Sequence, residues 1–364
     1  EEAVNSYTKT YMAGNQALGR NLDANAMRNH FYRFPGVDND KDKTLSAMLR
    51  MAVIAQTQER YEKAPVETDE QRAEKAALEG LVKQLFVELK RDFKPSDLPP
   101  YTLVKLGMHL AGTSQPEESI AYFDEILDPS EPDPVRKKAR INGMSKYRKN
   151  AVFGKAVALG RSKDNAKVDT AIKMMRDELS KEESSSNPDR KAMEDAKYNL
   201  VKFTSARQDW PSVIAAADKY RENKSYKKNL PEVLYLQGEA YLKQNELDKA
   251  LINFMNITGT YKGLVKWSAP AVLAQMDTLW KRNTMSQGAG KQPSDRYVAW
   301  KAGSQYVQLL DTPANRKKMT AEDSALVNEV KDKTAKFGSD PAVSQERADI
   351  AAYEAAVRAA KGQK

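Results

Sequence analysis

Apolar and polar residues follow the period of an amphipathic helix over nearly the whole chain. β-branched runs with strict two-residue alternation are missing, and no Asn-Gly or Asp-Gly turn joins two such runs. The pattern therefore predicts an all-α protein. Its helices are expected at 2–31, 42–63, 69–92, 100–112, 116–127, 134–160, 166–181, 189–206, 210–222, 231–244, 247–260, 267–283, 294–310, 320–336 and 342–360.

Local start signals support several of these helices. Thr68, with Gln71 three residues later, is a candidate capping box, and Thr320 with Asp323 is a weaker one. Asp209 precedes a proline in the first turn, where the missing N–H of proline is tolerated. Polar connectors separate the helices at Gly36–Lys43, Asp128–Asp133, Lys181–Asp189, Glu222–Asn229 and Ser286–Gln292.

The segment Pro231–Phe254 carries the most specific pattern in the chain. It predicts two helices joined by a tight polar turn, with large apolar residues where a gap must be filled and small residues where the helices cross. A larger Cβ at the crossing would push the axes beyond about 8–10 Å. The residues that carry this pattern are Leu234, Gly238, Tyr241, Ala250 and Phe254. They resemble the tetratricopeptide (TPR) repeat, a helical hairpin that binds other proteins.

Further units resemble the same repeat less completely. One begins at Pro100 and places Leu103, Leu106, Gly107, Leu110, Ser119, Phe123 and Ile126 at the key positions. Two weaker units cover Asn199–Tyr220, with Val201, Thr204, Val213 and Ala217, and Ala151–Leu179, with Ala156, Leu159, Ala171 and Met175. The resemblance implies a right-handed α-solenoid of about four to six hairpins. Its irregular lengths are similar to those of divergent TPR proteins of bacterial envelopes.

The hairpins suggest four regions along the chain. Residues 1–99 form an N-terminal helical region with a degenerate hairpin, and 100–181 hold TPR-like hairpins. Residues 189–264 hold further hairpins, including the best-matching one, and 265–364 form a C-terminal helical region. A division near Lys181–Asp189 is the expected place where one superhelix could split into two.

The resemblance also implies a binding surface, because TPR proteins hold their partners mainly on the concave face lined by first helices. Carried over to the best unit, that surface consists of Glu232, Tyr235, Glu239, Leu242 and Lys243. In the Pro100 unit it consists of Tyr101, Val104, Met108, Ala111 and Gly112. This second set is largely apolar, so it is expected either to form a groove for a partner helix or to be covered by the N-terminal helices.

Charge is concentrated in one segment. The chain has a net charge of +9, and between Arg136 and Lys163 there are ten basic residues and no acidic one. If 134–160 is one helix, a subset falls within about a third of its circumference. That subset is Arg136, Lys137, Arg140, Arg148 and Lys155. The segment either faces an acidic protein or an anionic envelope surface, or is a solvated helix whose acidic partners lie on neighbouring helices. No nucleic-acid-binding signature accompanies it.

Sequence features of catalysis are weak. The chain has no cysteine, which excludes disulfides and thiolate chemistry. His30 and His109 lack spaced ligand partners, and the acidic segment 38–42 lacks the glycine and the glutamate of a calcium loop. Two Ser-x-x-Lys strings, at 6–9 and 225–228, lack companion motifs. We therefore expect no catalytic residue, no metal and no cofactor.

Two further expectations complete the sequence-based picture. The four tryptophans, Trp210, Trp267, Trp280 and Trp300, are expected mainly to fill the core, with Trp267 beside a linker as the one exception to watch. No apolar stretch approaches the about 18 residues of a membrane span.

The sequence thus favours a non-enzymatic scaffold that binds a protein or peptide. The alternative is a structural subunit of an envelope assembly, which self-associates or docks on a larger machine. A start at Glu1 and the lack of cysteine suit an exported periplasmic or envelope protein, although a trimmed cytoplasmic protein would look the same.

Overall fold

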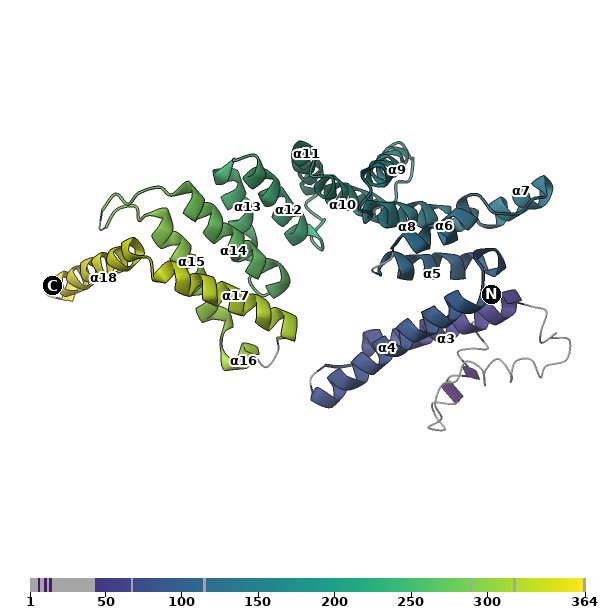
Figure 1. Cartoon of the computed structure of the whole chain (residues 1–364), viewed down its shortest axis with the longest axis horizontal. Helices are drawn as coiled ribbons and strands as arrows, with labels where there is room; N and C mark the ends of the chain where they lie inside the picture. The colour runs from purple at the N-terminus through teal and green to yellow at the C-terminus, as the bar shows by residue number, and fades with distance from the viewer. Residues whose placement is uncertain are drawn as a thin grey trace. The chain divides into compact units, whose positions relative to one another are not determined.

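A computed structural model describes residues 43–66, 68–113, 116–288, 290–316 and 319–362, together with Ser6, Thr10, Tyr11, Ala13 and Gly14. The helix expected at 2–31, His30 and the acidic segment 38–42 thus lie almost entirely outside the described residues. The described part is helical with no strand, and consecutive helices pack on one another (Figure 1). The predicted all-α class is confirmed at this level.

The helix bounds follow the predicted ones closely, with one exception. In the first half of the chain the helices are α3 (Lys43–Lys63), α4 (Asp69–Asp92), α5 (Pro100–Ala111), α6 (Ile120–Leu127), α7 (Pro134–Gly143), α8 (Arg148–Gly160) and α9 (Asn165–Glu183). Short 3₁₀ turns, η1 (Pro95–Asp97), η2 (Pro116–Ser119) and η3 (Ser145–Tyr147), lie between them.

The second half continues the same arrangement. Its helices are α10 (Arg190–Ala206), α11 (Trp210–Arg221), α12 (Leu230–Lys243), α13 (Leu247–Thr260), α14 (Val265–Arg282), α15 (Asp295–Leu310), α16 (Pro313–Arg316), α17 (Ala321–Gly338) and α18 (Pro341–Gly362). The capping boxes predicted at Thr68 and Thr320 are both present, and Asp209 accepts a hydrogen bond from the Ser212 amide.

The exception is the helix predicted over 134–160, which is broken. α7 ends at Gly143, and the chain passes through η3 before α8 begins at Arg148. Asn142 and Gly143 have low helix propensity, and Met144 is 3% exposed within the core of its half. The chain turns here because burial of Met144 outweighs continuation of the helix.

Contacts divide the chain into two compact units, Glu1–Met174 and Met175–Lys364, which we call unit 1 and unit 2. The division falls within α9, before the Lys181–Asp189 connector. In unit 1, α3 pairs with α4, α5 pairs with α6, and α8 packs against both α5 and α6. The side chains between them form one apolar core that includes Phe86, Leu103, Phe123 and Ile126.

Unit 2 is a row of helix pairs. The pairs α10–α11, α12–α13 and α14–α15 follow one another, and α17 packs on both α14 and α15. The first helices also contact one another, α10 with α12, α12 with α14 and α14 with α17. This layer of first helices positions the candidate site.

Two hairpins, one in each unit, repeat the same core contact. A Cβ added to Gly107 would lie 2.8 Å from Phe123, and one added to Gly238 would lie 2.6 Å from Phe254. Each phenylalanine follows its glycine by sixteen positions and is fully buried. Glycine is required at both places because the ring of the second helix occupies the space of a side chain on the first. The predicted crossing residues therefore do pack as expected.

The α10–α11 hairpin reverses the sizes at the same interval. Val201 and Ala217, also sixteen positions apart, lie in one buried cluster, with the larger residue now on the first helix.

The turns within the α10–α11 and α12–α13 hairpins have the same backbone geometry. Gln208 and Asn245 both have positive φ, 57° and 61°. The following amides, of Asp209 and Glu246, donate back to carbonyls in the last turn of the first helix at 3.1 and 2.9 Å.

Candidate functional site

The face of α12 between its two neighbouring first helices is the best candidate for partner binding. Helical spacing puts Glu232, Tyr235 and Glu239 on one side of α12, because residues three and four apart are neighbours on a helix surface. All three are half-buried, as is Leu242, whereas Lys243 is exposed. Leu242 packs against the buried cluster of Leu234 and Phe254, and so joins this face to the core of the α12–α13 hairpin.

Tyr235 lies at the centre of an aromatic group. Its ring centroid is 5.8 Å from that of Phe254 and 6.4 Å from that of Trp267 on α14, both in tilted arrangements. Burial, with the Glu239 carboxylate close by, raises the pKa of the Tyr235 hydroxyl to about 12. Tyr235 is therefore a neutral donor at physiological pH, fixed by rings from two helices.

Glu232 is held by the preceding first helix. The Tyr198 hydroxyl on α10 donates a hydrogen bond of 2.5 Å to one carboxylate oxygen of Glu232. Lys202 Nζ lies 3.5 Å from the other oxygen, and 43% of the Lys202 side chain is exposed. Glu239, one turn further along α12, is close to Tyr235 and Lys243. Burial raises the pKa of Glu239, and these two neighbours offset this effect only in part.

Together these residues define the first-helix face of unit 2: Tyr198, Glu232, Tyr235, Glu239 and Trp267. Spacing along α12 predicts three of them. Tyr198 and Trp267 belong to other hairpins, and their contacts with α12 depend on how the hairpins stack.

The corresponding surface of the Pro100 unit is largely covered. Val104 is 4% exposed and Ala111 is 4% exposed, and both belong to the core that also holds Met51 of α3 and Phe86 of α4. Val104 as a partner contact is therefore a wrong prediction, because the N-terminal helices occupy that side of α5. Tyr101 is half-buried against the same core, and Met108 is 45% exposed.

His109 on α5 is part of this covered surface. Its ring stacks on Phe86 of α4 with centroids 3.9 Å apart and planes 14° apart. Burial, with Lys83 as a smaller cause, lowers the pKa of His109. The side chain is therefore a neutral packing group at the junction of α4 and α5.

The five basic residues predicted to share one face of a helix at 134–160 do not lie on one helix. Since α7 and α8 are separate helices, Arg136, Lys137 and Arg140 lie on one, and Arg148 and Lys155 lie on the other. The basic patch on one continuous helix is therefore a wrong prediction, because the helix breaks between Gly143 and Arg148.

Three of the five basic residues pair with acidic residues of α6 and its C-terminal end. Lys155 lies 2.6 Å from Asp124, Lys137 lies 2.7 Å from Asp128, and Arg140 lies 3.0 Å from Glu125. The Arg136 and Arg148 side chains are exposed, and no ion pair or hydrogen bond joins them to a side chain in the part of the chain that the structure describes. The segment is thus largely a set of structural ion pairs with a neighbouring helix, and two of its five predicted cations face solvent.

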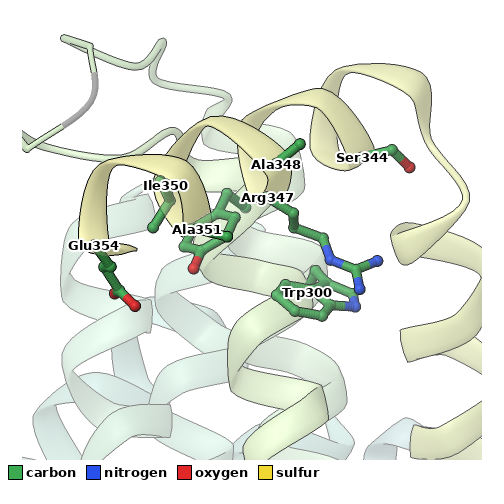
Figure 2. Close-up of a pocket in the computed structure, with 8 residues that line it drawn as sticks. Trp300, Ser344, Arg347, Ala348, Ile350, Ala351 and Glu354 are labelled. Atoms are coloured by element: carbon green, nitrogen blue, oxygen red, sulfur yellow. The ribbon is translucent and has the colours of Figure 1, made fainter. Parts of the chain in front are cut away.

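Unit 2 also contains a cavity of about 490 Å³ between α15 and α18 (Figure 2). Tyr297 and Trp300 of α15 line one side, and Ala348 and Ala351 of α18 are too short to close the other. Figure 2 shows Arg347 reaching from α18 over the Trp300 indole, at 4.1 Å from guanidinium carbon to ring centroid. The cavity falls in the size range of small-ligand sites, but its aromatic floor already has a cation over it.

The tryptophans are half-buried rather than central to the core. Trp280 stacks on Phe337 at 3.9 Å, and Trp300 lies beneath Arg347. Trp267 lies against Tyr235 on the first-helix face. The sequence singled out Trp267 as the one candidate exception to core packing, but it did not predict this contact.

No group of three or more histidine or acidic side chains in the described part of the chain could hold a metal ion. Within the same residues no helix is both long enough and apolar enough to cross a bilayer. Comparison of the chain with protein-family models, curated proteins and solved structures gave no match.

Proposed function

We propose that this protein is a non-enzymatic scaffold, a solenoid of TPR-like hairpins that binds a protein or peptide on the first-helix face of unit 2. The observation that carries the proposal is the partly accessible Tyr235, fixed between Phe254 and Trp267 on a layer of first helices that contact one another. Rigid aromatic side chains in a preformed surface bind at a small cost in ordering entropy. The right-handed superhelix belongs to the same proposal.

The repeat resemblance supports this function through particular contacts. The Gly107–Phe123 and Gly238–Phe254 pairs pack as the repeat pattern expects. We place the protein in the periplasm or envelope of a bacterium, on the basis of its irregular hairpin lengths and its lack of cysteine.

The test is a pull-down from the source organism with the full chain as bait. A variant with Tyr235, Glu239 and Lys243 all changed to alanine should lose the partner. The matched control changes Ile252 and Met255 to alanine; these residues are 59% and 54% exposed on α13, outside the first-helix face. The proposal fails if both variants retain every protein that the original chain binds.

A second candidate function is a self-associating subunit of a larger assembly. It is favoured by α18, where the apolar residues Ala351, Ala352, Tyr353, Ala355 and Ala356 are all exposed. Light scattering after size exclusion separates the two candidates. A stable oligomer that Ala352→Lys dissociates would favour the second, and a monomer at all concentrations would exclude it.

A further inference from the structure

Carboxylates on the first helices α10 and α12 accept hydrogen bonds from tyrosine hydroxyls. Tyr220 on α11 donates a hydrogen bond of 2.9 Å to Glu194 on α10, and Tyr198 on α10 donates one of 2.5 Å to Glu232 on α12. Tyr235 lies beside Glu239 in the same way. A phenol hydroxyl can orient a carboxylate, but it carries no positive charge. Each carboxylate is therefore positioned without being neutralised by its tyrosine.

The Asp295 carboxylate of unit 2 is held by a guanidinium instead of a phenol. This carboxylate is 2% exposed, and Arg282 donates to both of its oxygens, at 2.8 and 2.6 Å. The Thr284 amide adds a third hydrogen bond. Although burial opposes ionisation, these bonds lower the pKa of Asp295. A structural carboxylate in this fold is thus paired with a guanidinium, whereas those of the first-helix face are not.

The cations near the first-helix face are exposed lysines. Lys266 Nζ lies 5.5 Å from the centroid of the Trp267 ring, so that ring already has a cation over it. Lys202 is 3.5 Å from Glu232 and is substantially exposed. Lys243, one turn from Glu239, is also exposed. A further carboxylate, Glu329 on α17, is near enough to raise the pKa of Tyr235. Tyr235 is therefore bordered by carboxylates that a partner's cation could approach.

We propose that the partner presents lysine or arginine side chains to this face, and that Glu232 and Glu239 receive them beside the ring of Tyr235. A guanidinium suits the position well, because it can donate to a carboxylate while its plane lies against an aromatic ring. An acidic segment, a nucleic acid or an anionic lipid would instead meet like charge here. The inference rests on the proposed function and adds the chemistry of the partner.

The experiment is selection of short random peptides displayed on phage against the full-length protein. Peptides that bind the original chain, but not Tyr235→Ala, should be enriched in lysine and arginine and depleted in aspartate and glutamate. Their synthetic copies should bind about tenfold more weakly to Glu232→Gln/Glu239→Gln, and more weakly as salt is raised.

The matched control is Glu222→Gln, an exposed carboxylate at the end of α11 with no described side-chain interaction, which removes charge away from the face. Circular dichroism of Tyr235→Ala guards against loss of the fold. Glu222→Gln should keep the affinity for the selected peptides.

The outcomes separate the inference from the proposed function. Tyr235-dependent peptides that are acidic or uncharged overturn the inference and leave the scaffold function standing. Basic peptides that bind Glu232→Gln/Glu239→Gln and Glu222→Gln equally well also overturn it. If no peptide depends on Tyr235, the proposed function and the inference fail together.

Discussion

At the scale of single residues, the space beside Gly238 decides how α12 and α13 pack. A Cβ there would lie 2.6 Å from Phe254 Cε1, whereas one added to Gly259 on α13 would meet nothing within 4 Å. We expect Gly238→Ala to destabilise the protein by about 1–2 kcal/mol, because overpacking outweighs the better helix propensity of alanine. Gly259→Ala should be neutral or slightly stabilising. Urea unfolding of both variants, followed by circular dichroism, checks the pair; equal effects would contradict the crowding at Gly238.

Glu239 gives a prediction about pH. Burial raises its folded-state pKa above the ordinary value of 4.5, so between these two values the folded chain binds more protons than the unfolded chain. Stability therefore falls as pH rises through the folded pKa, and at neutral pH the carboxylate opposes folding. Glu239→Gln should raise the melting temperature at pH 7 by a small amount, and the difference should vanish below about pH 4. A lower melting temperature for the variant at pH 7 would show that Lys243 and Tyr235 fully stabilise the charge.

At the scale of elements, α7 depends on ionic contacts more than on apolar packing. None of its side chains is buried, and Val135 is 77% exposed. Arg140 Nη2 lies 3.0 Å from Oε1 of Glu125, whose side chain is 5% exposed. No hydrogen bond to this oxygen is formed within the described residues, so the ion pair with Arg140 is its main interaction. Arg140 also donates to the Ser96 carbonyl at 3.0 Å. The guanidinium thus ties α7 to α6 and to η1.

Removal of that guanidinium should be costly. Arg140→Leu leaves the buried Glu125 carboxylate without its cation, and we expect a loss of about 2 kcal/mol. The loss is moderate because 27% of the Arg140 side chain is exposed, so that water can approach from its side of the pair. Arg148→Leu, which removes an exposed cation that no residue in the described ranges pairs, should change stability by less than about 0.5 kcal/mol. Changing Glu125 to glutamine in the Arg140→Leu background should recover part of the loss. Denaturant titration of the three variants tests this, and equal losses for Arg140→Leu and Arg148→Leu would contradict it.

Sequence pattern predicts elements well here because most of their signals are local. The boxes at Thr68 and Thr320 involve residues three apart, and the face of α12 follows from helical spacing. What the sequence misses depends on distant packing. Burial of Met144 breaks a helix, and α3 and α4 cover Val104. The pairing of the basic segment with α6 and the contact of Trp267 with Tyr235 likewise join residues from different helices.

At the scale of the whole molecule, the two units have separate apolar cores. Phe123 belongs to that of unit 1 and Phe254 to one in unit 2, and both are fully buried. We expect calorimetry to show two unfolding transitions, because chains with more than one compact unit commonly depart from two-state behaviour. Phe123→Ala should lower the melting temperature of one transition, and Phe254→Ala that of the other. Each variant should reduce the free energy of unfolding of its own unit by about 3–5 kcal/mol, which is typical of a buried phenylalanine. A single transition shifted by both variants would contradict this independence.

The sixteen-residue interval between paired core positions limits how this sequence can change over generations. Phe254 meets Gly238 only while the turn at 244–246 keeps its length, since one inserted residue would rotate α13 by about 100°. Connectors between hairpins carry no such restriction, and those at 222–229 and 261–264 already differ in length. Among descendants of this chain, insertions and deletions should therefore accumulate between hairpins and be removed by selection from the turns within them, even while surface residues drift freely.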